Sequence, residues 1–351
     1  MKILIITNDW YPKKGGISTY LINLVKNFNQ EIFVFGPNWI EGDNTFRSSS
    51  KFIIPSRRII KEIQQVLKDK EISHILLGSS NPQFLLVHPL LKFNIPISMV
   101  AHGAEFNIIR FIPILRQIMT KSMNSVNVIF TISNFSVRKL EKITRTRILL
   151  IGAGYPDLVS ENKTKIKEVK HKIVGVSSRF VSRKKIDWVM EVCSLLSDEG
   201  YNLHLCVYGH GRLENKLKSL SELCSVKTFF YSDNENTNIE DFYKEIDIFA
   251  MPSHSRFFGL EYEGLGLVYL EAAIHGLPVI TGSSGGSPET IIPGKTGFVA
   301  NTKTHLYDAV KFFLDNPEAI ESFGIANKKY VLSKFSWVDV SRKLQQGLET
   351  N

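Results

Sequence analysis

The chain has 351 residues, enough for two domains of ordinary size, and its 43% hydrophobic and 22% charged residues are typical of a folded, water-soluble protein. This composition excludes a disordered, collagen-like or coiled-coil chain, and no apolar run approaches the roughly 20 residues of a membrane-spanning helix. The segment Met1–Asp9 becomes polar too early for a signal peptide. Cys193, Cys206 and Cys224 form no CxxC pair, so we expect buried thiols in a reducing cytoplasm.

The net charge of +9 is distributed unevenly along the chain. Residues 1–150 contain 20 Lys and Arg against 9 Asp and Glu, whereas the remaining residues carry a net charge of −2. Such a basic half predicts an anionic partner, either nucleic acid or an anionic membrane surface. A solvated basic surface that has no partner is the alternative.

The first half alternates short apolar runs, typical of buried strands, with longer amphipathic runs, typical of helices. We expect strands at Lys2–Thr7, Glu31–Phe35, His74–Leu77, Ile97–Ala101, Val126–Ile132 and Ile148–Ile151. Helices are expected between them, among them Ile17–Phe28 and Asn134–Leu140. Strands that alternate with helices in this way predict a parallel sheet.

The apolar pattern stops near Glu161–Glu168, where we place a domain linker, and the same alternation then resumes. Further strands are expected at Lys172–Val176, Leu203–Tyr208, Val226–Tyr231, Asp247–Ala250 and Pro278–Thr281. Further helices are expected at Ile186–Ser197, Leu213–Glu222 and Leu267–His275, and consecutive helices from Thr304 to Glu349. The sequence therefore predicts two doubly wound α/β domains with a cleft between them and with ligands beyond the carboxyl ends of the strands.

A pair of glycines, Gly15 and Gly16, follows the first expected strand and precedes a helix. Glycines at this place let the backbone approach a ligand closely, and a helix N-terminus favours an anion. The spacing is not the GxGxxG of a dinucleotide site, which argues against an NAD-dependent dehydrogenase. A plain turn from strand to helix is the alternative.

Four cations, Arg179, Arg183, Lys184 and Lys185, follow the first expected strand of the second half. Parallel sheets bind ligands at this end of a strand, and Arg and Lys both bind phosphate oxygens well. A phosphate-binding role is therefore one interpretation, and a solvated cationic turn is the other.

The stretch from Pro252 to Ala273 is the most informative part of the sequence. Glu263 lies in a glycine-rich turn, and Glu271 follows eight residues later within the expected helix. The backbone N–H groups of Gly264, Leu265 and Gly266 are expected to face a phosphate without any metal. A carboxylate in the turn can accept hydrogen bonds from sugar hydroxyls, and one in the helix can bind a ribose diol. A capped amphipathic helix is the alternative, but it does not explain why so apolar a helix carries Glu271.

In their order and spacing, these motifs resemble the GT-B glycosyltransferases of the large retaining family 4, over essentially the full chain. The matching residues are Gly15-Gly16, His102-Gly103-Ala104-Glu105, Ser133-Asn134, Arg179 with Lys184, Gly209-x-Gly211, Glu263 with Glu271, Ser284-Gly285-Gly286-x-Pro288-Glu289 and Phe335-Ser336-Trp337. The segment Arg256–Gly266 is similar to the phosphatidylinositol mannosyltransferase branch, which uses GDP-mannose. Lys185 departs from the pattern, because the family usually has Gly after the phosphate-binding Lys.

The resemblance implies a GT-B fold, in which two Rossmann-like domains face each other across a cleft. It implies an acceptor-side domain at residues 1–160 and a nucleotide-sugar-binding domain at residues 161–335. It also implies that a C-terminal helix at residues 336–351 packs back on the first domain.

The resemblance also implies roles for individual residues. Arg179 and Lys184 would bind the donor diphosphate, and Gly16 would approach it from the first domain. Glu271 would hold the nucleotide ribose. The donor sugar would contact Glu263 and the N–H groups of Gly264, Leu265 and Gly266, and His102 would lie near the sugar and the acceptor.

The departing nucleoside diphosphate develops charge that must be neutralised. Many glycosyltransferases use a metal held by a D-x-D motif, and this sequence contains no D-x-D. Because Arg179, Lys184 and helix N-termini can supply the positive charge, we expect no metal and no other cofactor. The family is retaining, and since no carboxylate is an obvious nucleophile for double displacement, we favour front-side attack assisted by the departing phosphate oxygen.

The resemblance predicts a hexosyltransferase that uses a nucleotide sugar, with GDP-mannose favoured, and a lipid-linked or cell-envelope glycan acceptor. One alternative is a nucleotide-sugar epimerase of the same architecture, which needs no acceptor. Another is a nucleic-acid-binding protein, but no stacking aromatic residues lie among the basic ones, so we expect no nucleic-acid partner.

The segment Phe106–Met119, followed by Lys121, mixes bulky apolar residues with arginines. Such a composition is typical of a segment that lies on a bilayer surface. We therefore expect a cytoplasmic enzyme that docks peripherally on the inner face of the cytoplasmic membrane, attracted by anionic lipids. The alternative is that Pro113 begins an ordinary helix whose apolar side belongs to the core.

Overall fold

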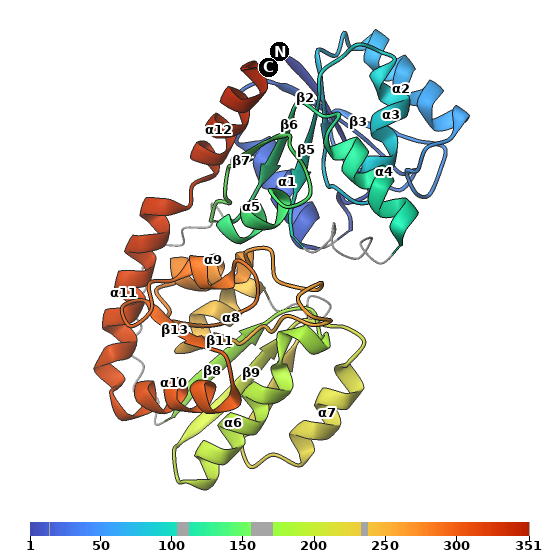
Figure 1. Cartoon of the computed structure of the whole chain (residues 1–351). Coiled ribbons are helices and arrows are strands. Elements are labelled where there is room, and N and C mark those ends of the chain that lie inside the picture. Colours follow the sequence, from blue (N-terminus) through green and yellow to red (C-terminus); the bar gives the residue numbers. More distant parts are fainter. Residues whose placement is uncertain (14, 104–111, 156–170, 233–237, 351) are drawn as a thin grey trace. The chain divides into compact units, whose positions relative to one another are not determined.

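The computed structural model describes residues 1–13, 15–103, 112–155, 171–232 and 238–350, and it divides into two compact units (Figure 1). Unit 1 comprises Met1–Gly154 and Phe335–Asn351, and unit 2 comprises Tyr155–Lys334. The linker expected at Glu161–Glu168 lies outside the described residues. Residues 335–351 hold two basic and two acidic side chains, so unit 1 keeps the whole positive excess of the first half.

Unit 1 is built on a seven-stranded sheet whose neighbouring strands are all parallel. The strands are β1 (Lys2–Ile6), β2 (Glu31–Gly36), β3 (Thr45–Arg47), β4 (His74–Leu77), β5 (Ile97–Ala101), β6 (Val128–Thr131) and β7 (Arg147–Leu150), in the spatial order β3-β2-β1-β4-β5-β6-β7. The chain runs outward from β1 in both directions, which is the expected doubly wound topology. The short strand β3 was not expected, because its three residues, Thr45–Arg47, form no apolar run.

Helices cover both faces of the unit 1 sheet. They are α1 (Gly16–Lys26), α2 (Arg57–Asp69), α3 (Val87–Leu91), α4 (Pro113–Met123), α5 (Asn134–Leu140) and α12 (Trp337–Glu349), with a 3-10 turn at Gln83–Leu86. In Figure 1, α2, α3 and α4 lie on one side of the sheet, and α12 lies on the other, where it contacts α1. Helix α2 begins where the Ser56 hydroxyl accepts the N–H of Ile59, and it buries Ile59 and Ile63 one turn apart.

The C-terminal helix α12 packs within unit 1. Its first residue, Trp337, is buried, and the ring lies edge-on to Tyr20 at 5.1 Å between centroids. A Cβ at Gly154 would clash with Trp337, so the end of the first segment and the start of α12 are closely packed. Residues distant in the sequence thus complete one core.

Unit 2 contains a six-stranded sheet, and its neighbouring strands are also parallel. The strands are β8 (Lys172–Ser177), β9 (Leu203–Tyr208), β10 (Lys227–Tyr231), β11 (Ile248–Met251), β12 (Val279–Gly282) and β13 (Gly297–Ala300), in the spatial order β10-β9-β8-β11-β12-β13. The four-residue strand β13 was not expected, and the other five lie within one residue of the expected bounds. The strand order reverses between β8 and β11, which is where such sheets bind ligands.

The helices of unit 2 are α6 (Ile186–Asp198), α7 (Glu214–Glu222), α8 (Ile239–Glu245), α9 (Leu267–Ile274), α10 (Lys303–Asp315) and α11 (Pro317–Lys334). Helix α6 contacts α7 and α10, while α9 contacts α11. Helix α9 is apolar almost throughout and buries Tyr269, Leu270 and Ala273. This burial fixes the rotation of α9 and therefore the position of its one carboxylate, Glu271.

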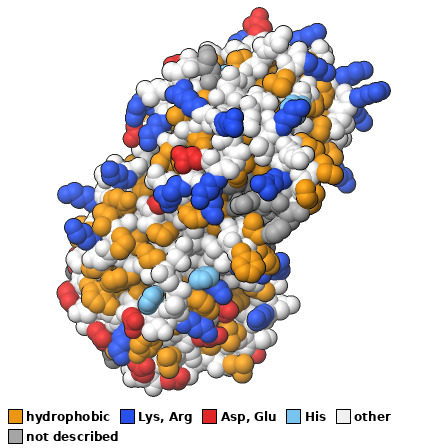
Figure 2. All heavy atoms as spheres, viewed as in Figure 1, with side chains coloured by type: hydrophobic (Ala, Val, Ile, Leu, Met, Phe, Trp, Pro, Cys, Tyr) orange, Lys and Arg blue, Asp and Glu red, His pale blue; other side chains and the backbone are white. Residues whose placement is uncertain are grey.

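The surfaces of the two units differ in charge. On the face shown in Figure 2, Lys and Arg side chains are spread over unit 1 with few acidic ones among them. Within the described ranges, no helix has both the length and the apolar character needed to cross a bilayer.

Candidate active site

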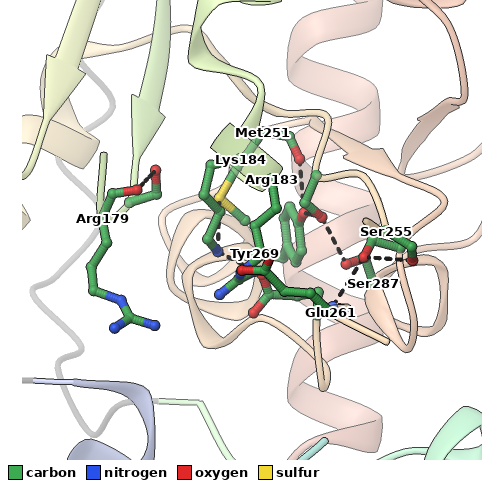
Figure 3. A network of polar contacts seen from close by, with 12 residues as sticks. Arg179, Arg183, Lys184, Met251, Ser255, Glu261, Tyr269 and Ser287 are labelled. Carbon is green, nitrogen blue, oxygen red and sulfur yellow. Dashed lines mark hydrogen bonds and ion pairs between the residues drawn. The ribbon is translucent and has the colours of Figure 1, made fainter. Parts of the chain in front are cut away.

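Charged side chains meet at the carboxyl edge of the unit 2 sheet (Figure 3). Arg183 and Lys184 belong to the 3-10 turn Ser182–Lys184, between β8 and α6. Glu261 and Glu263 belong to the segment between β11 and α9. Because β8 and β11 are neighbours in the sheet, the segments that follow them are brought together at one edge.

The turn that carries the cations ends at Lys185, which has a left-handed backbone with φ 54° and ψ 39°. Glycine adopts this conformation more readily than other residues do, which explains the family's preference for it. Here Lys185 adopts it instead, and its Nζ lies 4.5 Å from the centroid of the Trp188 ring. The departure from the family pattern therefore preserves the turn.

The two cations of this turn share one carboxylate oxygen. Lys184 Nζ donates to Glu263 Oε2 at 2.6 Å, and Arg183 Nη1 donates to the same oxygen. Arg183 Nε also lies 3.6 Å from Glu261 Oε1, and Arg256 Nη1 lies 3.6 Å from Glu261 Oε2. The alternating series Arg256, Glu261, Arg183, Glu263 and Lys184 is called the charge row below.

The inner part of the charge row is buried. The side chains of Arg183, Lys184 and Glu263 are only 11%, 7% and 12% exposed. Burial alone would raise the pKa of Glu263, but Lys184 and Arg183 lower it to about 2. Burial lowers the pKa of Lys184 to about 8, since the attraction of Glu263 is opposed by Arg183 and Arg179. Glu263 is therefore ionised at neutral pH. A further anion beside Lys184 would stabilise the positive charge of Lys184.

Arg179 lies beside the charge row but outside it. Its side chain is exposed, and no acidic group of the described residues forms an ion pair with it. In Figure 3 its guanidinium extends apart from the group around Lys184. With Arg179 included, the site has four cations and two carboxylates, a net charge of +2. The two negative charges of an esterified diphosphate would balance this excess.

The glycine-rich turn after Glu263 leads directly into α9. Gly266 is the N-cap of the helix and has φ 92°, and a Cβ there would clash with the Tyr269 ring. Among the described residues, no acceptor faces the backbone N–H groups of Gly264, Leu265 and Gly266. These groups and the N-terminus of α9 are together suited to binding an anion.

A second glycine-rich turn, after β12, holds the backbone of Glu263. The Glu263 N–H donates to Ser284 Oγ at 3.0 Å, and the Gly286 N–H donates to the Glu263 carbonyl at 3.0 Å. Gly285 has φ 60°, and a Cβ there would clash with the same carbonyl. The two glycine-rich turns therefore lie together, and they fix the position of Glu263.

Glu271 lies in the second turn of α9, where it is half-buried and separate from the charge row. Its Oε2 accepts a hydrogen bond from the Tyr243 hydroxyl at 2.9 Å. Burial raises the pKa of Glu271, although the Tyr243 hydrogen bond opposes this shift. The hydrogen bond holds the carboxylate in one orientation, which suits it to binding a vicinal diol.

The two candidate residues of the first half lie in unit 1. Gly16 is the first residue of α1, and open space surrounds the place where its Cβ would be. His102 follows β5, its Nε2 is 2.8 Å from the Gly78 carbonyl, and its ring lies edge-on to Tyr20. Ala104 and Glu105 of the same motif lie outside the described residues.

No individual role was expected for three residues of the charge row, Arg183, Glu261 and Arg256. Arg183 precedes Lys184 directly, and the sequence does not show which of two neighbouring cations points inward. Glu261 and Glu263 are two residues apart, a spacing that puts side chains on one side of an extended segment. That spacing was the available signal for Glu261.

Comparison with known proteins relates this architecture to a large enzyme family. The family model described as "Glycosyl transferases group 1" matches residues 159–330. A GDP-mannose-dependent monoacylated alpha-(1-6)-phosphatidylinositol monomannoside mannosyltransferase of Corynebacterium glutamicum is 26% identical, over 99% of this chain and 98% of the relative.

Solved structures resemble the whole chain. Sucrose-phosphate synthase from Thermosynechococcus elongatus has a TM-score of 0.81 at 17% identity, covering 99% of this chain and 98% of that one. The Anabaena protein HepE in complex with UDP-glucose has a TM-score of 0.78 at 14% identity, with complete coverage of both chains. These likenesses confirm the expected fold class of two parallel-sheet α/β units.

Proposed function

Because residues 159–330 place this chain among the group 1 glycosyl transferases, we propose that it transfers mannose from GDP-mannose to a hydroxyl of a lipid-linked or cell-envelope glycan. Hexosyl transfer from a nucleotide sugar is the activity of the family. The choice of GDP-mannose and of a lipid-linked acceptor is supported by the name of the Corynebacterium relative. The structural observation that carries the proposal is the buried charge row beside Arg179, which forms no ion pair with an acidic group of the described residues.

The donor diphosphate binds between Lys184, Arg179 and the N-terminus of α9. Lys184 Nζ already donates to the Glu263 carboxylate at 2.6 Å, and a phosphate oxygen of the donor accepts a further charge-assisted hydrogen bond from the same Nζ. Arg179 adds a planar donor fork from the exposed side. Their positive charges stabilise the departing nucleoside diphosphate, as an oxyanion hole stabilises its oxyanion, and no metal or other cofactor takes part.

Glu263 and Glu271 bind different parts of the donor. Glu263, together with the N–H groups of Gly264, Leu265 and Gly266, holds the sugar beside the diphosphate. Glu271, oriented by Tyr243, accepts the hydroxyls of the nucleotide ribose. Gly16 leaves room for the diphosphate at the start of α1, and His102 meets the sugar and the acceptor.

The reaction retains the anomeric configuration through front-side attack. The bond from the anomeric carbon to the phosphate oxygen breaks, and the acceptor oxygen bonds to the same face. The departing phosphate oxygen takes the proton of the acceptor hydroxyl. Trapping a covalent glycosyl-enzyme would contradict this mechanism, because front-side attack forms no such intermediate.

Donor profiling tests the proposed function. The purified chain is incubated with a panel of nucleotide sugars that includes GDP-mannose and UDP-glucose, and release of the nucleoside diphosphate is measured. We expect slow hydrolysis of GDP-mannose in preference to the others. A nucleotide sugar converted to its epimer without release of the diphosphate would favour the epimerase instead.

Unit 1 docks on the inner face of the cytoplasmic membrane, where it meets a lipid-linked acceptor. Its excess of positive charge supports this role. Helix α4 buries Met119 and Met123 and exposes Ile114, Arg116 and Lys121, so its exposed side chains are both apolar and basic. The rest of the candidate segment, Phe106–Phe111, lies outside the described residues.

Vesicle co-sedimentation at low and high salt tests this docking. We expect binding to anionic vesicles that weakens as salt rises, because the Debye length shortens. Neutralising Arg110, Arg116 and Lys121 together should weaken it further. A protein that ignores anionic vesicles at low salt would favour a water-soluble acceptor.

A further inference from the structure

A tight hairpin in unit 2 displays two adjacent phenylalanines to solvent. The Arg256 N–H donates to the Glu261 carbonyl at 2.9 Å, and these two residues form an antiparallel bridge. Between them, Phe257 and Phe258 form the tip, and their side chains are 60% and 108% exposed. The two residues are called the aromatic tip below.

The backbone of the aromatic tip is unfavourable for the residues it carries. Phe257 has φ 49° and Phe258 has φ 54°, and Gly259 follows with φ 82°. Left-handed backbone is an outlier for bulky side chains and is tolerated mainly by Gly, Asn and Asp. Neither the conformation nor the exposure of two apolar rings stabilises the folded chain. A ligand that covers the rings would explain why they are displayed.

We propose that the aromatic tip inserts into the surface of a lipid bilayer. The Arg256 guanidinium carbon lies 4.7 Å from the centroid of the Phe257 ring, so a cation sits directly at the base of the tip. When the rings enter the upper acyl region, this cation lies at the level of the lipid phosphates. Glu261 does not repel them, because it is paired with Arg256 and Arg183.

The size and shape of the tip favour a bilayer over a protein partner. A stable protein interface buries about 800 Å² on each side, whereas one aromatic side chain contributes about 150–250 Å². Two rings on a convex turn therefore fall short of a protein interface. A fluid bilayer needs no complementary groove and accepts a small apolar wedge flanked by a cation.

The base of the hairpin is connected to the donor site. Glu261 joins the hairpin to Arg183, and Arg183 joins it to Glu263, so the charge row runs from the tip to Lys184. Insertion of the tip into a bilayer does not depend on the proposed function. The statement that this bilayer is the membrane that carries the acceptor does depend on it. Insertion of the tip would then hold the donor-binding unit at the surface that carries the acceptor.

The test uses the full chain and two kinds of vesicle, neutral phosphatidylcholine and phosphatidylcholine mixed with anionic phosphatidylglycerol, each at low and high salt. The test variant is F257N/F258N, because Asn tolerates left-handed backbone and the hairpin should keep its shape. The matched control is Leu223→Asn, which removes another apolar side chain of unit 2 that is 84% exposed. Melting temperatures and GDP-mannose hydrolysis without vesicles are measured for all three proteins.

We expect the unaltered chain to retain binding to neutral vesicles at high salt, because salt does not screen apolar insertion. F257N/F258N should bind these vesicles about tenfold or more weakly, given the free energy of burying aromatic rings. Leu223→Asn should bind like the unaltered chain, and donor hydrolysis should be equal in all three.

Two results would overturn the inference: no binding of the unaltered chain to neutral vesicles, or equal binding by F257N/F258N. Both would leave the proposed function standing if GDP-mannose is hydrolysed. If no nucleotide sugar is hydrolysed, the proposed function fails, and the vesicle comparison still decides whether the tip binds lipid.

Discussion

The two units share one sheet architecture but differ at the edges where their strands end. At the unit 1 edge, Asn8 Nδ2 donates to the Ile53 carbonyl and Thr131 Oγ1 donates to the Ala101 carbonyl, both at 3.0 Å, and the ion pair that follows β1, between Lys13 and Asp9, has a half-exposed lysine. At the unit 2 edge, charged side chains bond to one another through the charge row. The overall charge has the opposite trend, since unit 1 is basic and unit 2 is slightly acidic. Under the proposed function, the diphosphate therefore binds in the slightly acidic unit, among buried and locally paired cations, and the net charge of a domain does not locate this site.

Removing Lys184 should have the largest effect. We expect Lys184→Ala or Arg179→Ala to lower kcat/KM for GDP-mannose by about 10²–10³, the loss typical of one electrostatic contact to a transition state. Lys216→Ala, an exposed cation on α7, is the matched control in unit 2. Lys121→Ala tests the contrast with unit 1, and donor hydrolysis without vesicles should not change. An equal loss in Lys121→Ala would break the comparison between the units.

The two glutamates of unit 2 should give different kinetic defects. Glu263→Gln should lower kcat more than it raises the donor KM, because Glu263 holds the reacting sugar and both buried cations. Glu271→Gln should mainly raise the donor KM, by about tenfold, the value of one hydrogen bond to a charged group. Steady-state kinetics with varied GDP-mannose separate the two. Identical defects would show that the roles are divided wrongly.

The pH dependence of kcat/KM should reflect the protonation of Lys184 at the unit 2 edge. The pKa of Lys184 is lowered to about 8, so the free enzyme loses this cation as pH rises through that value. We expect kcat/KM to fall about tenfold per pH unit above pH 8, since only the protonated form binds the diphosphate. Lys184→Arg should move this decline to higher pH, because Arg stays protonated. A decline that is unchanged in Lys184→Arg would assign it to another group.

The unit 1 edge, where His102 contacts a backbone carbonyl, should respond less to substitution. His102→Asn removes the imidazole that contacts the Gly78 carbonyl, and it should lower kcat by about tenfold, the effect of one hydrogen bond. Because His102 carries no diphosphate contact, nucleotide binding should stay unchanged by calorimetry with GDP. A loss of activity as large as that of Lys184→Ala would show that the two edges contribute equally to catalysis.

A chelator should have no effect. Arg179, Lys184 and the N-terminus of α9 supply the positive charge in the proposed mechanism, so activity should survive excess EDTA. Loss of activity in EDTA that is restored by Mn²⁺ or Mg²⁺ would refute metal independence.

The elements of the fold followed from local sequence patterns to a large extent. Strands β4, β5 and β9 were expected at their observed residues, because buried parallel strands are short and mostly apolar runs. Helix α2 lies between two expected strands, where a helix was expected without stated bounds, and Ile59, Ile63 and Leu67 recur there at helical spacing. Short β3 and β13 are stabilised by pairing with a neighbour, which no local pattern reveals.

The candidate site was predictable in its residue types but not in its pairing. Lys184 and Glu263 were candidates separately, but they meet across 79 residues of sequence. Their contact depends on β8 and β11 being neighbours, a property of the whole sheet. Arg183 was one of four cations noted after β8, but its inward direction was not predictable, because the Lys185 turn and carboxylates of a distant loop set it.

The placement of α12 has a consequence for the order in which the molecule is made. Unit 1 begins the chain, but Trp337 closes its core against Tyr20 only after all of unit 2 has been synthesised. Unit 2 is a continuous stretch with its own core, so it can fold first on the ribosome. Until α12 has been synthesised, unit 1 has an uncovered apolar surface around Tyr20 and Phe130. The half of the chain that is synthesised first is therefore the half that completes its folding last.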